Sequence, residues 1–279
     1  MFYPNSNPIM KAISSIFIFL ILTFSCIAKN SPKESFHIFL LMGQSNMAGY
    51  GEILPEDKSP IEGVVMLRNS ITEKDEQFCW VAAKQPIHNR LPSDQFCLAG
   101  PFAQAYHTMY PASTVGLIPM AWGGAAISQM EKGSTFYEEV IRKATWAKQQ
   151  GRLKAILWHQ GESDTVSPET AEQYYQKLEK LIHNLRFDLN EPDLPVIIGD
   201  LAEFYGTGKE HNAPERINRL NLIRKSLKEI SQKIPNTEFV STTGLVSHDQ
   251  HQVHFNRQSY IILGYRYFDV YWNHYSDKQ

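Results

Sequence analysis

Residues 40–50 read LLMGQSNMAGY, where an apolar run stops at a glycine and a small polar tripeptide follows. The run begins at Phe36 and has the length of a buried strand, and Gly43 permits a tight turn after it. A serine in such a turn is a nucleophile if a histidine reaches its hydroxyl and backbone N–H groups face the oxyanion; otherwise it is a capping residue. Both interpretations of Ser45 stay open on this stretch alone, because Met47 replaces the second glycine of a Gly-x-Ser-x-Gly elbow.

From residue 35 onward, short apolar runs alternate with longer helical patterns, which is typical of βαβ units on a parallel sheet. The predicted strands are residues 36–42, 64–68, 114–119, 155–159, 196–201 and 239–242. The predicted helices are residues 102–109, 136–149, 170–185, 214–234 and 258–271. Most of residues 52–101 lack periodic apolar residues, and we interpret them as a long loop beside a binding site. The length and pattern predict a single α/β domain over residues 29–279.

The first 28 residues have the pattern of a secretory signal peptide. Lys11 precedes an apolar run over residues 13–22, which is too short to span a bilayer, and small residues follow it. We expect cleavage after Ala28 and export to the periplasm or the extracellular space, with no transmembrane span. Met1 to Pro8 then form an extension upstream of a natural start. Lipid anchoring at Cys26 is the alternative.

The charge balance excludes one class of partner. Lys and Arg number 27 against 29 Asp and Glu, and they are scattered, so no basic stripe exists for a nucleic-acid backbone. In an exported protein, Cys79 and Cys97 are either a disulfide or two buried thiols, and their spacing does not decide between the two. The cysteines imply no metal site.

Two further polar blocks follow predicted strands, and a third near the C-terminus is rich in histidine. They read WGGA at residues 122–125, HQGESD at 159–164 and HDQHQVHF at 248–255. Ligands of parallel sheets bind at the carboxyl ends of the strands, so these blocks are expected to meet at Ser45. Gly124 can bring a backbone N–H close to a bound oxygen, and Gln160 offers a neutral amide donor. We interpret Asp164 as an acidic residue at a helix N-terminus.

The blocks GQSNMAG, GLIPMAWGGAAI, WHQGESD and VHFNRQSYIILGYR, in order between His37 and Tyr267, closely resemble the carbohydrate acetylesterases of the SGNH hydrolase superfamily. This group includes sialate O-acetylesterase-like and acetylxylan esterase proteins. The resemblance implies a flavodoxin-like, three-layer α/β/α fold with a parallel central sheet. It also implies removal of O-acetyl groups from carbohydrates through an acetyl-serine intermediate, without metal or cofactor. Carried over by position, Ser45 is the nucleophile, His254 is the general base, and the N–H of Ser45, Gly124 and Gln160 form the oxyanion hole.

One position departs from that family pattern. His251 stands where an aspartate usually orients the catalytic histidine. We favour Asp249 as the replacement, with Glu162 or a backbone carbonyl as alternatives. The departure also leaves open a catalytically impaired relative that binds glycans. A metallohydrolase built on His248, His251 and His254 is a further alternative.

Four aromatic side chains are candidates for stacking on a sugar substrate, although aromatic residues at strand ends also serve simply as packing. They are Tyr50, Trp80, Trp122 and Tyr205. The identity of the acetylated sugar does not follow from the sequence.

Overall fold

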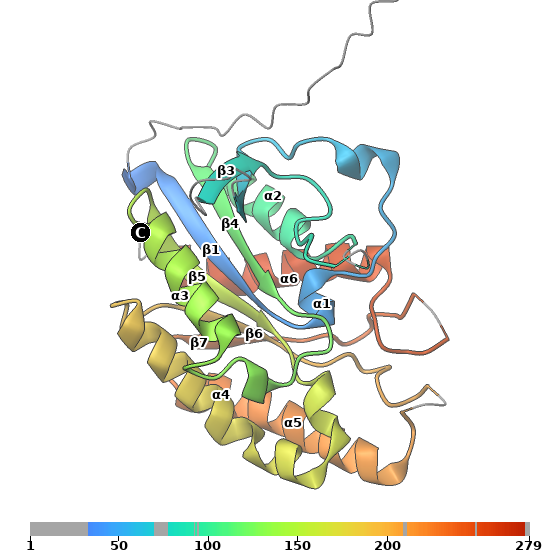
Figure 1. Ribbon diagram of the computed structural model, residues 1–279. Helices are drawn as coiled ribbons and strands as arrows, with labels where there is room; N and C mark the ends of the chain where they lie inside the picture. Colours follow the sequence, from blue (N-terminus) through green and yellow to red (C-terminus); the bar gives the residue numbers. More distant parts are fainter. Residues whose placement is uncertain are drawn as a thin grey trace, which may run out of the picture.

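The computed structural model describes residues 33–69, 78–91, 93, 95–208, 211–248 and 250–276 (Figure 1). The predicted signal peptide, Cys26 and Asp249 therefore lie outside the described residues.

Seven strands of the described chain form one sheet in the order β3-β2-β4-β1-β5-β6-β7. Their bounds are β1 (Phe36–Gly43), β2 (Val64–Asn69), β3 (Phe78–Ala82), β4 (Thr114–Ala121), β5 (Arg152–His159), β6 (Val196–Gly199) and β7 (Thr237–Val240). All neighbouring pairs are parallel except β2 and β3. The expected parallel sheet is confirmed, with one antiparallel edge strand.

The edge strand β3 was missed by the sequence analysis, which assigned its residues to a loop. It pairs antiparallel with β2, with Cys79 opposite Arg68. Phe78 and Trp80 alternate inward, and the Trp80 ring packs edge-on against Phe36 with ring centroids 5.0 Å apart. Five residues with a partly buried pattern are too short a signal for periodicity to separate from a loop.

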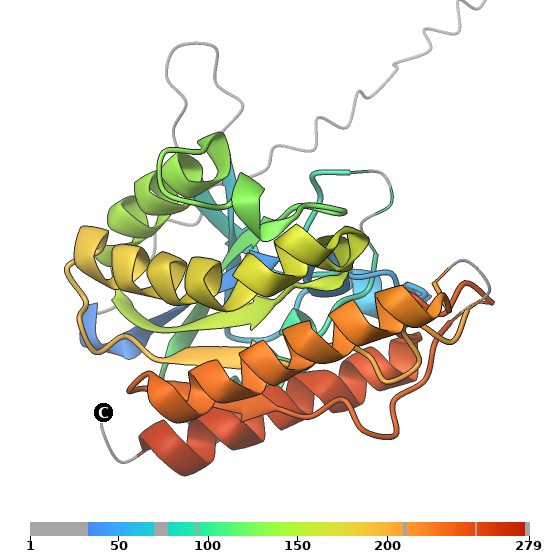
Figure 2. The same ribbon diagram turned by 90° about the horizontal axis from the view of Figure 1, so that it is seen from below.

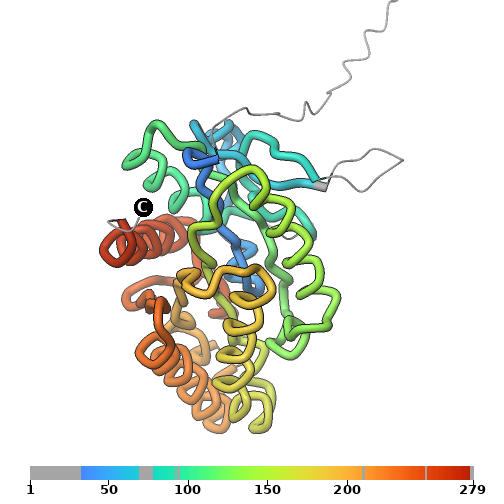
Figure 3. Tube along the Cα trace, turned by 90° about the vertical axis from the view of Figure 1, so that its left-hand side faces the viewer, coloured from blue at the N-terminus to red at the C-terminus, as the bar shows by residue number. Residues whose placement is uncertain are grey.

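Helices cover both faces of the sheet. Their bounds are α1 (Ser45–Ala48), α2 (Ala99–Met109), α3 (Thr135–Lys148), α4 (Pro168–Asp188), α5 (Pro214–Lys233) and α6 (Arg257–Tyr275), with short 3-10 helices η1 (Lys33–Ser35), η2 (Pro55–Lys58), η3 (Ile127–Gln129) and η4 (Glu162–Val166). Figure 2 shows α3 and α4 on one side of the sheet and α6 on the other, and α2 packs against α6. Along the Cα trace, β1 runs between α6 and α3 (Figure 3). These are the three layers expected of an α/β/α fold.

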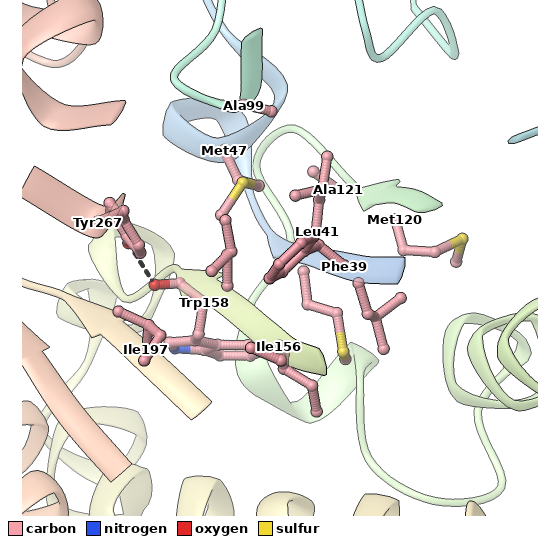
Figure 4. Packing of buried hydrophobic residues seen from close by; sticks show 14 of the residues in the cluster. Phe39, Leu41, Met47, Ala99, Met120, Ala121, Ile156, Trp158, Ile197 and Tyr267 are labelled. Atoms are coloured by element: carbon pink, nitrogen blue, oxygen red, sulfur yellow. Dashed lines mark hydrogen bonds between the residues drawn. The ribbon is translucent and has the colours of Figure 1, made fainter. Parts of the chain in front are cut away.

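The core is centred on β1, every residue of which is buried. Phe39 and Leu41 pack there with Trp158 of β5, and the Tyr267 hydroxyl on α6 donates to the Trp158 carbonyl at 2.7 Å (Figure 4). Because β1 lies between β4 and β5, the carboxyl ends of these three strands are adjacent. The polar blocks after them are therefore brought to one place.

Cys79 and Cys97 are not joined to each other by a disulfide, so that alternative is not observed. Cys97 is buried and its thiol approaches Oε1 of Gln85 at 3.7 Å. No helix in the described part of the chain is both long and apolar enough to cross a membrane.

Candidate active site

The turn after β1 is held tightly against the ends of both neighbouring strands. The Gln44 N–H donates to the His159 carbonyl at 3.1 Å, and the Trp122 N–H donates to the Gly43 carbonyl at 3.0 Å. Gly43 has φ 149°, and a Cβ on it would lie 2.1 Å from the His159 carbonyl oxygen. Glycine is required at this position because the approach of β5 leaves no room for a side chain.

Ser45 begins the four-residue helix α1 and is 5% exposed. Neither its hydroxyl nor its N–H forms a hydrogen bond to another described residue, and the same holds for the Gly124 N–H. Gly124 has φ 72°, and a Cβ on it would meet no atom within 4 Å. Two backbone donors at the carboxyl ends of β1 and β4 are therefore available to a ligand, as an oxyanion hole needs.

Asn46 connects the Ser45 turn to the segment that carries His254. Its Nδ2 donates to the Val253 carbonyl at 3.0 Å and to Oε1 of Glu162 at 2.6 Å. Its Oδ1 accepts from the Phe255 N–H at 3.4 Å and from the Tyr260 hydroxyl at 2.9 Å. Asn46 is fully buried, so all of these contacts are shielded from water. The residues on both sides of His254 are thereby fixed beside Ser45.

Sequence reasoning missed Asn46. It stands within the family-like GQSN block, but its partners lie at the other end of the chain and no local pattern identifies them. An amide side chain directly after a candidate nucleophile was the available signal, since an amide can satisfy donors and acceptors together.

The half-buried His254 sits on one arm of a short hairpin closed by a bridge between Ser247 and Phe255. The His248 N–H on the other arm donates to the His254 carbonyl at 3.1 Å, and the two imidazole rings are 6.0 Å apart. The His254 ring stacks on Tyr50 with centroids 3.7 Å apart and planes 7° apart. The imidazole is therefore backed on one face by an aromatic ring.

Of the two carboxylates considered as partners of His254, Glu162 is described and Asp249 is not. Glu162 is buried; its Oε1 accepts from Asn46 and its Oε2 has no hydrogen-bond partner among the described residues. Burial raises the pKa of Glu162 to about 6, partly opposed by the Asn46 hydrogen bond. Glu162 thus contacts the His254 segment through Asn46. His251, which stands where the family usually has an aspartate, is exposed.

Gln160 contacts Gln44, the residue before Ser45, but its amide is used within the protein. Its Nε2 lies 2.6 Å from Oδ2 of Asp164 and 3.1 Å from both the Gln44 side-chain oxygen and the Ala125 carbonyl. An amide has two N–H bonds, so three acceptors already occupy its donor capacity. Donation from Gln160 to an oxyanion requires one of these contacts to open.

Asp164 stands in the first turn of a short helix, as expected, and its carboxylate also connects two loops. It lies in η4, and its carboxylate accepts from Gln160 and from the Ile127 N–H at 3.0 Å. Burial is the largest influence on its pKa and raises it. Ser163 donates to the Gly124 carbonyl at 2.9 Å. These bonds tie the Gly124 loop to the Gln160 loop, which fixes the Gly124 N–H.

Two of the four candidate sugar-stacking residues are buried, so neither presents an open ring face on which a sugar could stack: Trp80 is 5% exposed and Tyr205 is 3% exposed. Tyr50 has one ring face covered by His254. Trp122 is half-buried, and the Arg90 guanidinium lies 3.6 Å from its ring centroid. Arg90 belongs to the segment that was expected to border the site, and sequence reasoning did not single it out.

The histidine cluster does not form a metal site in the described chain. Within the described ranges, no group of three or more His, Cys, Asp or Glu side chains is arranged to hold a metal ion, and His248, His251 and His254 all belong to those ranges.

Comparisons with known proteins place residues 35–273 in one family. They match the family model described as "carbohydrate esterase, sialic acid-specific acetylesterase". A probable carbohydrate esterase of Arabidopsis thaliana is 35% identical over 187 residues, 60% of this chain and 69% of that protein. Its crystal structure superposes with a TM-score of 0.72 at 28% identity, covering 86% of this chain and 98% of the other.

Two more distant structures are similar in fold. NanS has a TM-score of 0.66 at 16% identity and covers 88% of this chain and 99% of its own. A carbohydrate acetylesterase of Xanthomonas citri has a TM-score of 0.59 at 17% identity, covering 85% of this chain and 57% of its own. At these identities the likeness concerns the fold alone.

Proposed function

The chain belongs to the carbohydrate esterase family of sialic acid-specific acetylesterases, and we propose that it is an exported serine esterase that removes O-acetyl groups from carbohydrates. The observation that carries the proposal is the Asn46 connection, which fixes the His254 segment beside a serine whose hydroxyl and N–H are free of other described residues. Nucleophile, base and oxyanion donors then converge at the carboxyl ends of β1, β4 and β5.

In the proposed reaction, the Ser45 hydroxyl attacks the acetyl carbonyl while His254 takes its proton. The negative oxygen of the tetrahedral intermediate is stabilised by the N–H groups of Ser45 and Gly124. Gln160 adds a third donor if its contact with the Ala125 carbonyl opens. The bond between the acetyl carbon and the sugar oxygen breaks, the sugar oxygen takes the proton from His254, and the acetyl group stays on Ser45.

Water completes the cycle. His254 takes a proton from a water molecule, the resulting hydroxide attacks the acetyl-serine carbonyl, and the bond to Ser45 breaks. Acetate leaves and the serine oxygen regains its proton from His254. The chemistry uses no metal in this scheme, because the proton transfers and the oxyanion stabilisation are assigned to His254 and to backbone N–H groups.

We propose Asp249 as the carboxylate that orients His254, with Glu162 as the alternative acting through Asn46. Support for Asp249 is its place in the sequence, two residues before the family's usual position. The support for export is the sequence pattern of residues 1–28.

The test is acetate release by the purified protein from acetylated xylan, acetylated sialic acids, acetylated monosaccharides and an aryl acetate. Ser45→Ala should lower kcat/KM by more than about 10³-fold, because the covalent route is lost. The matched control is Ser231→Ala, on the exposed face of α5, which should leave the rate unchanged. Full activity of Ser45→Ala would refute the proposal. A wild-type protein that binds glycans but releases no acetate would favour the glycan-binding alternative.

A further inference from the structure

Tyr50 is held by backbone hydrogen bonds on both sides. The Gly51 N–H donates to the Phe96 carbonyl at 3.1 Å, and the Phe96 N–H donates back to the Gly51 carbonyl at 2.9 Å. The Gln95 N–H donates to the Gly49 carbonyl at 3.0 Å. The main chain that carries Tyr50 is therefore anchored before any ligand arrives, so the ring is presented to His254 from a fixed position.

The two rings lie nearly parallel, 3.7 Å apart and tilted by 7°, which is van der Waals contact across the full ring face. No sugar ring fits between planes at that spacing. The negative face of an aromatic ring attracts a cation placed over it. An imidazolium on His254 therefore lies where the Tyr50 ring stabilises it, and the contact also fixes the plane of the imidazole.

Other groups near His254 act on it in different ways. His248 faces it from the opposite arm of the hairpin at 6.0 Å, and two cations there would repel each other. The Glu162 carboxylate on η4 reaches its segment through Asn46. Asp249 lies outside the described residues. Among the described aromatic residues, Tyr50 is the stacking partner of His254 at van der Waals distance.

Resting on the proposed function, we propose that Tyr50 is a positioning residue for the general base: its ring holds the His254 imidazole in plane and stabilises the imidazolium that forms when Ser45 attacks. In this contact, His254 also covers the ring face of Tyr50 on which a sugar would otherwise stack.

The test compares Tyr50→Leu, which keeps bulk but removes the aromatic face, with Tyr50→Phe, which keeps the ring. An aryl acetate and an acetylated sugar are used in parallel. Tyr50→Leu should lower kcat about tenfold on both esters, a part of the 10²–10⁴-fold that a positioned base contributes. The acid limb of its kcat/KM profile should move about half a pH unit downward, since the imidazolium loses its π partner. Tyr50→Phe should restore both values.

The control is Tyr265→Leu, on an exposed position of α6, which should match the wild type. Because Tyr50→Leu can fail to fold, NMR of the unmodified protein gives a second measurement. A ring facing Tyr50 places the His254 ring protons upfield of those of the exposed His183.

Each outcome is decisive for the proposal. A higher KM for the sugar with an unchanged kcat for the aryl acetate would make Tyr50 a sugar platform and overturn the inference. A tenfold loss without movement of the acid limb would reduce Tyr50 to a scaffold role. Unshifted His254 ring protons would equally overturn it. Full activity of Ser45→Ala would instead remove the proposed function on which the inference rests, so the two failures are distinguishable.

Discussion

Substitution Glu162→Gln changes the charge of a buried group without changing its shape. Glu162 accepts a 2.6 Å hydrogen bond from Asn46 on one oxygen, and its other oxygen has no hydrogen-bond partner among the described residues. Burial therefore disfavours the charged carboxylate, and its pKa rises from the usual 4.5 to about 6. The glutamine keeps the acceptor for Asn46 and does not titrate.

The direction in which the free energy of unfolding changes with pH follows from proton binding by Glu162. Between pH 4.5 and 6 the folded protein holds the Glu162 proton and the unfolded chain has released it, so the free energy of unfolding falls as pH rises. The pKa difference corresponds to about 2 kcal/mol. Glu162→Gln should therefore gain about 2 kcal/mol relative to the wild type between pH 4.5 and pH 7. An unpaired glutamine N–H adds a cost that does not depend on pH, and it cancels in this comparison.

The difference between the two proteins must be measured, because other groups act in the opposite direction. Burial lowers the pKa of His88 and of His159 to about 3. For each, stability is present above the unfolded value of about 6.5 and is lost as pH falls. The stability of the wild type is therefore expected to decrease in acid, and only the variant isolates the contribution of Glu162.

The assay is urea unfolding of both proteins at pH 4.5, 5, 6 and 7, with the slope m compared as a check on two-state behaviour. The matched control, Glu172→Gln, removes one carboxylate from an exposed position of α4 and should run parallel to the wild type. Parallel curves for Glu162→Gln as well would refute the reasoning, because the carboxyl group would then not be buried with one oxygen unpaired.

Asn46→Ala should cost about 4 kcal/mol in urea unfolding at pH 7 and lower kcat more than it raises KM, because four hydrogen bonds are lost, one of them to the Glu162 carboxylate. The control is Asn221→Ala, on an exposed turn of α5. A loss of stability below about 1 kcal/mol for Asn46→Ala would contradict the role given to its four hydrogen bonds. Gly43→Ala should cost about 3 kcal/mol or more, or prevent folding, because its Cβ meets the β5 backbone. Gly133→Ala shares the positive φ, but its added Cβ meets no atom within 4 Å. Equal losses of stability from the two variants would contradict the steric explanation for Gly43.

The central strands were predictable because the local signals agreed. The apolar run before Gly43 is long, fully buried in β1 and bounded by a polar turn. The observed ends of β1, β4 and β5 lie within three residues of those expected. The strand β3 was not predictable, because a half-buried edge strand is specified by its partner β2 rather than by its own period.

The candidate site was predictable as a set of residues and not as a set of contacts. Ser45, Gly124, Gln160 and His254 each follow a strand end or lie in a recognisable block, and the structure brings their segments together. Whether an aromatic residue contacts substrate or packs inside was undecided, and burial settled it for Trp80 and Tyr205.

The sequence by itself determined the alternation of strands and helices, the glycine that ends the first apolar run, and the residue types available at each strand end. These are local properties, because backbone conformation and apolar periodicity are set by residues only a few positions apart. Only the tertiary structure decided that Asn46 clamps a segment 207 residues away, that His254 rests on Tyr50, and that Glu162 is buried with one oxygen unpaired. Burial and pairing depend on which distant segments become neighbours, and that is set when the whole sheet closes on its core.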